Sequence, residues 1–264
     1  MKLEIARFPA EGKKRGSVVF LHGAWCWNWY WKPFFGPYFA AQGYEGVALS
    51  LRGHGASEGL AEINSFSIGD YVRDLRSAVE LLDDPLIIGH SMGGFVTQAY
   101  LARHSARGAV LLASAPPRPV YSQLFKVLLS QPFNVLRAGL AQTVPSGTSD
   151  LDTLRRQMFS REPEDRSMDM YLGNIQAESY RAIASMLTRG LRQSGLVKSP
   201  LLVIGAGRDR LVSPEAVALT GRFYRARPVM FEEMSHMLML EPRWRDVADA
   251  ILRFDAALPH PTGS

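Results

Sequence analysis

The sequence has almost no cysteine: Cys26 is the only one among 264 residues. A single cysteine excludes an internal disulfide framework and a cysteine-rich zinc site. It is consistent with a reducing compartment, so we expect a cytoplasmic protein. The fold needs neither a disulfide nor a metal site for stability, because a chain of this length can bury roughly 70–75% of its extended surface.

Long hydrophobic runs are also missing. No stretch approaches the roughly 18 uninterrupted apolar residues of a membrane-spanning helix. The N-terminal stretch MKLEIARFPAEGKKRG has scattered charges and no apolar core, so it does not resemble a secretory signal peptide. We therefore expect a chain without a membrane span.

Blocks of like charge are absent as well. The net charge is +5, from 30 Lys and Arg against 25 Asp and Glu, but the positive residues are spread along the chain. This distribution argues against nucleic acid as a partner. The small-molecule ligand that we expect instead follows from the motifs described below.

What the sequence does contain is an alternation of short apolar runs with helical patterns, which is typical of parallel α/β architecture. Most of the runs are unbroken, as expected for strands covered on both faces. The predicted strands are residues 17–21, 46–49, 86–89, 108–113, 201–205 and 228–231, with 3–8 as an antiparallel edge strand. The predicted helices are residues 68–82, 92–104, 214–224 and 243–258.

One stretch interrupts the alternation. Residues 116–196 contain no convincing buried strand, begin with PPRP and carry several helical patterns. We interpret them as a helical cap, or lid, inserted into a core formed by residues 1–115 and 197–264.

The strongest chemical signal is Gly89-His90-Ser91-Met92-Gly93, a G-x-S-x-G motif between an apolar run and a helical pattern. Its glycines leave space where strand and helix approach, so that Ser91 would lie exposed at the carboxyl end of the sheet. The following helix would offer N–H groups and a positive dipole to a developing oxyanion. The alternative, a strand–helix turn with an incidental serine, is disfavoured because both flanks match.

A serine nucleophile needs a base, and the base needs an orienting acid. In this context the expected chain order is Ser, then Asp or Glu, then His. Asp209 follows the strand at 201–205, and His236 follows the strand at 228–231. Because parallel strands end at the same edge of a sheet, we predict a catalytic triad of Ser91, Asp209 and His236.

Other histidines and acids suit structural roles better. His22 precedes the serine in a loop where structural hydrogen bonds are usual, and His54 lies in a glycine-rich turn. His90 should point away from the apex that its neighbour occupies. Asp70 and Asp74 fall on a predicted helix, where we expect them on the solvated face.

A His-Gly pair ends the strand at 17–21 and points to an oxyanion hole. Gly23 would free the N–H of Ala24, which together with the N–H of Met92 could bind the oxyanion. Taken alone the pair could be a simple turn, but the downstream G-x-S-x-G motif favours the catalytic interpretation.

These motifs resemble the α/β-hydrolase superfamily, specifically its serine esterases and lipases with a helical cap. The resemblance rests on HGAW (22–25), RGHGAS (52–57), GHSMGG (89–94), GAGRD (205–209) and HMLMLEP (236–242). RGHGAS and GHSMGG are similar to carboxylesterases and monoacylglycerol-lipase relatives. The Trp-rich HGAWCWNWYW is similar to the plant methylesterase and hydroxynitrile-lyase branch. Ser235 stands where many relatives have glycine before the catalytic histidine.

The resemblance implies hydrolysis of a carboxylic ester through an acyl-enzyme, without a metal or organic cofactor. We expect an apolar acyl or aromatic group in the substrate. The predicted substrate contacts are Trp25, Phe125, Leu128, Leu211 and Met237. A C–C bond hydrolase, a cofactor-free perhydrolase and a small-molecule receptor remain alternatives, because one fold supports all of them. Dehalogenases and epoxide hydrolases are disfavoured, since they use Asp at the position of Ser91.

Overall fold

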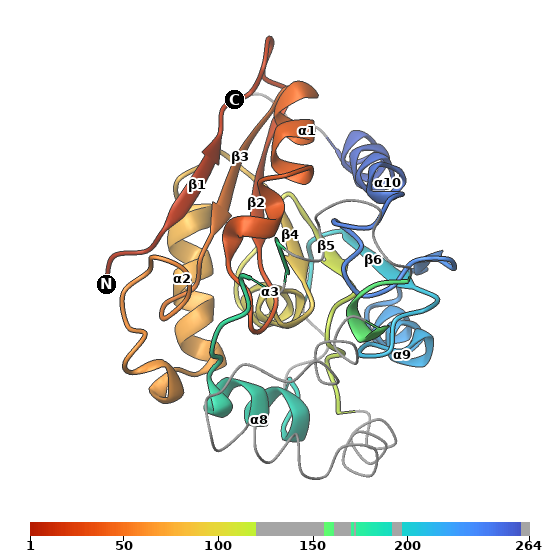
Figure 1. Ribbon diagram of the computed structural model, residues 1–264. Coiled ribbons are helices and arrows are strands. Elements are labelled where there is room, and N and C mark those ends of the chain that lie inside the picture. Colours follow the sequence, from red (N-terminus) through yellow and green to blue (C-terminus); the bar gives the residue numbers. More distant parts are fainter. Residues whose placement is uncertain (120–155, 161–169, 172, 192–196, 260–264) are drawn as a thin grey trace.

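The computed structural model describes residues 1–119, 156–160, 170, 171, 173–191 and 197–259 (Figure 1). Within this part of the chain, seven strands form one sheet in the order β1-β3-β2-β4-β5-β6-β7. The strands are β1 (Ile5–Phe8), β2 (Gly16–Leu21), β3 (Tyr44–Leu49), β4 (Leu86–His90), β5 (Gly108–Leu112), β6 (Leu201–Ala206) and β7 (Val229–Phe231). Only β1 runs antiparallel to its neighbour, so the predicted edge strand and the predicted α/β class are confirmed.

The described helices include all four that were predicted. The full set of described helices is η1 (Asn28–Trp31), α1 (Phe35–Ala41), η2 (Ile63–Ser65), α2 (Ile68–Val79), α3 (Met92–Leu101), α8 (Tyr180–Thr188), α9 (Pro214–Tyr224) and α10 (Trp244–Ala256). The predicted helices correspond to α2, α3, α9 and α10. Helix α1 was not predicted, because it contains Gly36 and Pro37, which disfavour helix. Its Phe35 and Phe39 are fully buried, so packing compensates for the poor propensity.

Each central strand is buried on both faces, which explains the unbroken apolar runs. In β2, Val18 and Phe20 face a cluster that includes residues of α1 and α10. Val19 and Leu21 face a second cluster with α2 and α3. Helix α9 packs on β6 through a smaller cluster. Helix α8 lies apart from the sheet and contacts α2 and η2 (Figure 1).

The strand register brings the carboxyl ends of five strands, β2, β4, β5, β6 and β7, to one edge of the sheet. The aligned pairs are Leu21 with Gly89, His90 with Leu112, Leu112 with Ile204, and Ala206 with Phe231. The residues that follow β2, β4, β6 and β7 therefore emerge side by side, and they include every predicted catalytic group.

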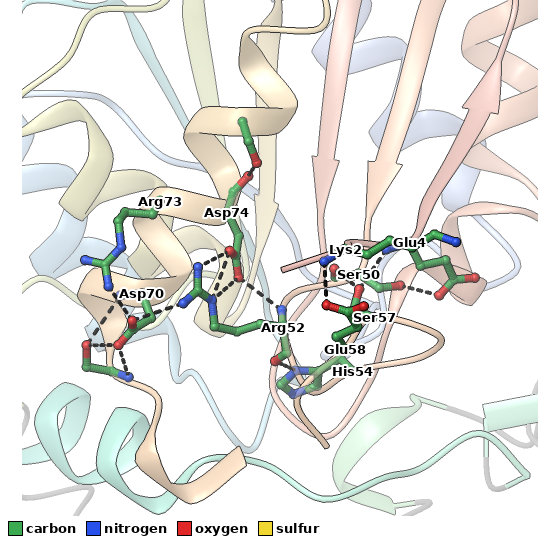
Figure 2. A network of polar contacts seen from close by, with 12 residues as sticks. Lys2, Glu4, Ser50, Arg52, His54, Ser57, Glu58, Asp70, Arg73 and Asp74 are labelled. Carbon is green, nitrogen blue, oxygen red and sulfur yellow. Dashed lines mark hydrogen bonds and ion pairs between the residues drawn. The ribbon is translucent and has the colours of Figure 1, made fainter. Parts of the chain in front are cut away.

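Two acids expected on the solvated face of the helix at 68–82 have structural roles. Asp70 forms a capping box with Ser67 at the start of α2. Asp74 is only 2% exposed and accepts hydrogen bonds from the Arg52 guanidinium and main-chain N–H (Figure 2). The expectation was wrong for Asp74, because helical position alone does not show that an arginine from the RGHGAS loop covers it.

Among the described helices, none is both long enough and apolar enough to cross a membrane.

Candidate active site

Ser91 lies between β4 and α3 with φ 53° and ψ −117°, a conformation that few residues other than glycine adopt. Strain of this kind at a strand-to-helix turn is typical of an exposed nucleophile. Close packing requires the flanking glycines. A Cβ on Gly89 would overlap Thr97 Oγ1, and one on Gly93 would overlap the carbonyl oxygen of His22.

The predicted acid and base are paired. His236 Nδ1 lies 2.8 Å from Asp209 Oδ2. The other carboxylate oxygen accepts the N–H groups of Leu211 at 2.8 Å and Val212 at 2.9 Å. Because a carboxylate only accepts, Nδ1 donates in this pair, which leaves Nε2 of the neutral ring with a free lone pair.

The loop that carries His236 contacts the turn that carries Ser91. The ring centroids of His90 and His236 are 4.7 Å apart, and His90 directly precedes the serine. The three predicted triad residues therefore lie at the same edge of the sheet. The Ser91 hydroxyl makes no hydrogen bond to His236 or to any other described residue; such contacts often form only when substrate binds.

His22 orients the loop that contains Ala24. Its Nδ1 lies 2.8 Å from the Gly23 carbonyl oxygen, and its Nε2 accepts the N–H of Leu51 at 2.9 Å. The ring is neutral, because burial and the neighbouring His54 lower the pKa of His22 to about 3. The C=O and N–H of a trans peptide point in opposite directions, so the bond to Gly23 turns the Ala24 N–H away from His22.

The same loop lies against Ser91, the predicted nucleophile. A Cβ on Gly23 would be 2.9 Å from Ser91 Cβ, which leaves no room for a side chain. Met92, the second predicted oxyanion donor, follows Ser91 as the first residue of α3 and is buried. Gly23, which precedes the predicted donor Ala24, and Met92 thus both lie beside Ser91.

The predicted substrate contacts differ in exposure. Trp25 is 43% exposed and has a positive φ of 60°. Leu211 is half-buried beside the acid, and Met237 is buried. Trp25 therefore offers the largest accessible apolar surface of these three. Phe125 and Leu128 lie outside the described residues.

Glu241 connects the base loop to residues 156–160 of the predicted cap. Its buried carboxylate accepts the N–H and hydroxyl of Ser160, at 2.8 and 2.6 Å, and the N–H of Ser235 at 3.2 Å. Met237 donates its N–H to the same segment at 3.0 Å. Glu241 was not predicted as a site residue, although it lies within the HMLMLEP motif.

Glu178 makes a similar connection on the other side of the site. Its carboxylate accepts hydrogen bonds from His54 Nε2 at 3.0 Å and from the Tyr71 hydroxyl at 2.7 Å. His54 Nδ1 faces the Arg52 carbonyl oxygen at 3.0 Å (Figure 2). Burial opposes a charge on this ring, but the Glu178 carboxylate raises the pKa of His54 above its ordinary value. The two side chains form a buried ion pair.

The segment that precedes α8 also contacts the predicted oxyanion loop. Gln176 donates its main-chain N–H to the carbonyl oxygen of Trp25 at 3.0 Å, and its side chain accepts the N–H of Gly55 at 2.9 Å. Two segments of the predicted cap are therefore hydrogen-bonded to the loops that would carry the chemistry.

We expect Glu178→Gln to reduce the free energy of unfolding by about 3–5 kcal/mol, because it leaves half of a buried ion pair without its partner. Despite burial, His54 lowers the pKa of Glu178. The pair thus stabilises the fold fully between about pH 4.5 and 6.5, the ordinary values of the two groups. Its contribution is lost as pH falls through the folded pKa of Glu178 or rises through that of His54.

Melting temperatures of wild type and Glu178→Gln, measured inside this range and in acid and alkali on either side of it, check the expectation. The matched control is Glu80→Gln, which breaks an exposed pair with Arg76 and should change the melting temperature little. In alkali His54 loses its charge in the wild-type protein too, so the difference in melting temperature between wild type and Glu178→Gln should become smaller. A difference that stays the same would contradict the ion pair.

A cleft of about 460 Å³ borders the acid loop. Its lining residues are Arg156, Phe159, Ser160, Gly207, Arg208, Asp209 and Arg210. Asp209 is among these described residues and Ser91 is not, so the cleft adjoins the predicted acid and not the predicted nucleophile. The described part of the chain holds no cluster of three or more His, Cys, Asp or Glu residues that could bind a metal ion.

A mostly parallel sheet, a strained serine after a central strand and an Asp–His pair after later strands together define an α/β hydrolase. Residues 18–250 match the alpha/beta hydrolase family, and the chain belongs to it. The family membership predicted from the motifs is therefore confirmed.

Known relatives span different activities. A monoacylglycerol lipase of Mycolicibacterium smegmatis is 28% identical over 185 residues, which cover 66% of this chain and 63% of that protein. A non-heme chloroperoxidase of Kitasatospora aureofaciens is 39% identical over 79 residues, 28% of each chain. The chain thus spans less than two thirds of the length of these two relatives. A solved esterase of Exiguobacterium antarcticum shares the fold, with a TM-score of 0.74 at 17% identity and coverage of 97% of this chain and 96% of the esterase.

Proposed function

We propose that this protein is a serine hydrolase that cleaves carboxylic esters through an acyl-enzyme intermediate. The observation that carries the proposal is the 2.8 Å contact between Asp209 and His236, on a loop that touches the strained Ser91 turn. The similarity to a monoacylglycerol lipase supports an ester whose acyl group is apolar. An ester with an aromatic group would fit the site as well as one with an apolar acyl group, because the exposed Trp25 would offer the aromatic ring of the substrate a flat apolar surface.

In the proposed reaction His236 Nε2 accepts the proton of the Ser91 hydroxyl as its oxygen attacks the acyl carbonyl. Asp209 holds the ring through Nδ1 and stabilises its charged form. The N–H groups of Ala24 and Met92 bind the oxyanion. His236 then donates the proton to the departing alcohol, which leaves an acyl-enzyme. Water activated by His236 releases the acid and restores the serine.

Residues 116–196 would act as a cap over this site, on a core of residues 1–115 and 197–264. The hydrogen bonds of Ser160 with Glu241 and of Glu178 with His54 support this division, because both join the predicted cap to the core beside the site. Apolar walls around a few polar groups are usual for such pockets.

Turnover of p-nitrophenyl esters from acetate to palmitate tests the proposal, with burst kinetics as the signature of an acyl-enzyme. The relationship to a chloroperoxidase makes a perhydrolase the second candidate, which bromide oxidation in acetate and hydrogen peroxide would detect. A vinylogous 1,5-diketone tests C–C hydrolysis. Binding of esters without turnover would instead identify a receptor.

We expect Trp25→Ala to change ester selectivity more than overall activity. The exposed ring lies next to the predicted oxyanion donor Ala24, so its loss should lower kcat/KM for aryl and long-chain esters by about 10-fold, the effect of a few lost methylene contacts. Acetate turnover should change little. Leu81→Ala is the control, since Leu81 is also 43% exposed but follows α2. An unchanged selectivity ratio would remove Trp25 from the substrate pocket.

A further inference from the structure

Two buried side chains beside the site take no part in the proposed reaction. Tyr30 lies in η1, within the Trp-rich segment, and is fully buried. His90 is the last residue of β4 and is also buried. Their hydrogen bonds connect the oxyanion loop, the nucleophile turn and the base loop.

These hydrogen bonds have a single direction. The main-chain N–H of Gly23 can only donate, and it lies 2.6 Å from the Tyr30 hydroxyl oxygen. Tyr30 therefore accepts this bond and donates its own proton to His90 Nδ1, at 3.1 Å. With Nδ1 as acceptor, the neutral ring carries its proton on Nε2, which donates to the carbonyl oxygen of His236 at 3.1 Å.

Burial keeps both groups in these protonation states. It raises the pKa of the Tyr30 phenol well above its ordinary value. It lowers the pKa of His90 well below the ordinary value, and a charge on His236 lowers it further. The same chain of hydrogen bonds therefore persists when His236 becomes positively charged during the proposed reaction.

The geometry points to Tyr30 and His90 as positioning residues, which hold the oxyanion loop and the base loop on either side of Ser91. This inference rests on the proposed function, because it assigns a role in that reaction. At one end of the chain of bonds is Gly23, directly against the nucleophile. At the other end is the main chain of His236, the proposed base.

The effect on the oxyanion donor follows from the peptide geometry. Tyr30 holds the peptide unit before Gly23 through its N–H, and His22 holds the unit after Gly23 through its C=O. Because the second unit also contains the N–H of Ala24, the direction of that donor depends on both side chains.

We expect Tyr30→Phe, which removes the hydroxyl and keeps the ring, to lower kcat for p-nitrophenyl butyrate by about 10- to 100-fold. This is less than the loss of an entire oxyanion donor, about 10²–10³. KM should stay within about twofold, since alignment matters in the transition state. Affinity for a trifluoromethyl ketone, whose carbonyl becomes an oxyanion when serine adds to it, should fall by the same factor as kcat.

Tyr44→Phe is the matched control for stability. Tyr44 is also buried, and its hydroxyl donates to Asp255 at 2.6 Å from the opposite end of the strands. This variant should lower the melting temperature and leave kcat and ketone affinity unchanged. If Tyr30→Phe behaves in the same way, Tyr30 only packs the core and the inference is wrong.

Two further measurements keep the inference testable if Tyr30→Phe does not fold. His90→Gln should show the same selective loss of kcat, and wild-type kcat in a folded His90→Gln would overturn the inference. In the wild-type protein, ¹⁵N NMR should find His90 neutral with its proton on Nε2. A proton on Nδ1 would be incompatible with the series of hydrogen bonds from Gly23 to His236 and would overturn the inference. Absence of ester turnover and of fluorophosphonate labelling in wild type would instead reject the proposed function.

Discussion

Ser91→Ala is expected to lose ester turnover by about 10³-fold or more and to lose all labelling by a fluorophosphonate. Ser91 is the proposed nucleophile, and members of a triad act as a unit, so that removing one removes most of the rate enhancement. Alanine is close to serine in size, so the fold should be retained. Intact-mass spectra and kcat measured on the same preparation check both effects.

A buried serine elsewhere in the sheet provides the control for this prediction. Ser17 lies in β2, and its hydroxyl has no hydrogen-bond partner. Ser17→Ala should keep full labelling and turnover. A fluorophosphonate adduct on a residue other than Ser91 would contradict the assignment of the nucleophile.

Asp209→Asn is expected to reduce kcat by about 10³- to 10⁴-fold while the protein stays folded, as removal of a triad carboxylate does. The reason lies in the two N–H groups of Leu211 and Val212, which donate to one carboxylate oxygen. They would select the amide oxygen of asparagine and turn its NH₂ toward His236. Nδ1 would then have to accept, which places the ring proton on Nε2, where it blocks proton transfer from serine.

Asp249→Asn is the matched control, because Asp249 also accepts a hydrogen bond from a side chain, the hydroxyl of Tyr38, but lies on α10. It should keep wild-type kcat. The pH dependence of kcat/KM should be measured for both variants, so that they are compared with wild type in the pH range where kcat/KM is constant. Wild-type turnover in Asp209→Asn would assign the acid role to another residue.

The arrangement of the sheet could be predicted because its signals are local. Strands covered on both faces produce unbroken apolar runs, and α9 begins where Ser213 caps the helix and Pro214 occupies the first turn. The contact between Asp209 and His236 was also predictable, since the ends of parallel strands meet. The structure places these side chains 2.8 Å apart.

Contacts between distant segments could not be predicted in this way. Glu178 pairs with His54 across 124 residues of sequence. In sequence, Glu178 resembles an ordinary solvated charge, and so does Asp74. The glycine-rich turn around His54 indicates a structural role but does not show which residue pairs with the ring. The hydrogen bonds of Tyr30 with Gly23 and His90 depend on how η1 packs against β2, which no periodicity encodes. Burial of a polar group becomes visible only once its partner is known.

Buried glutamates join the described segments of the predicted cap to the core: Ser160 binds Glu241 near His236, the predicted base, and Glu178 binds His54. Under the proposed function, force applied to either segment would therefore be transmitted to loops beside the reacting groups. A substrate long enough to press on the cap would spend part of its binding energy on aligning those loops, and this energy would increase kcat and not only affinity. Under the proposed function, the enzyme would distinguish long from short substrates by how fast it turns them over, even when it binds both equally well.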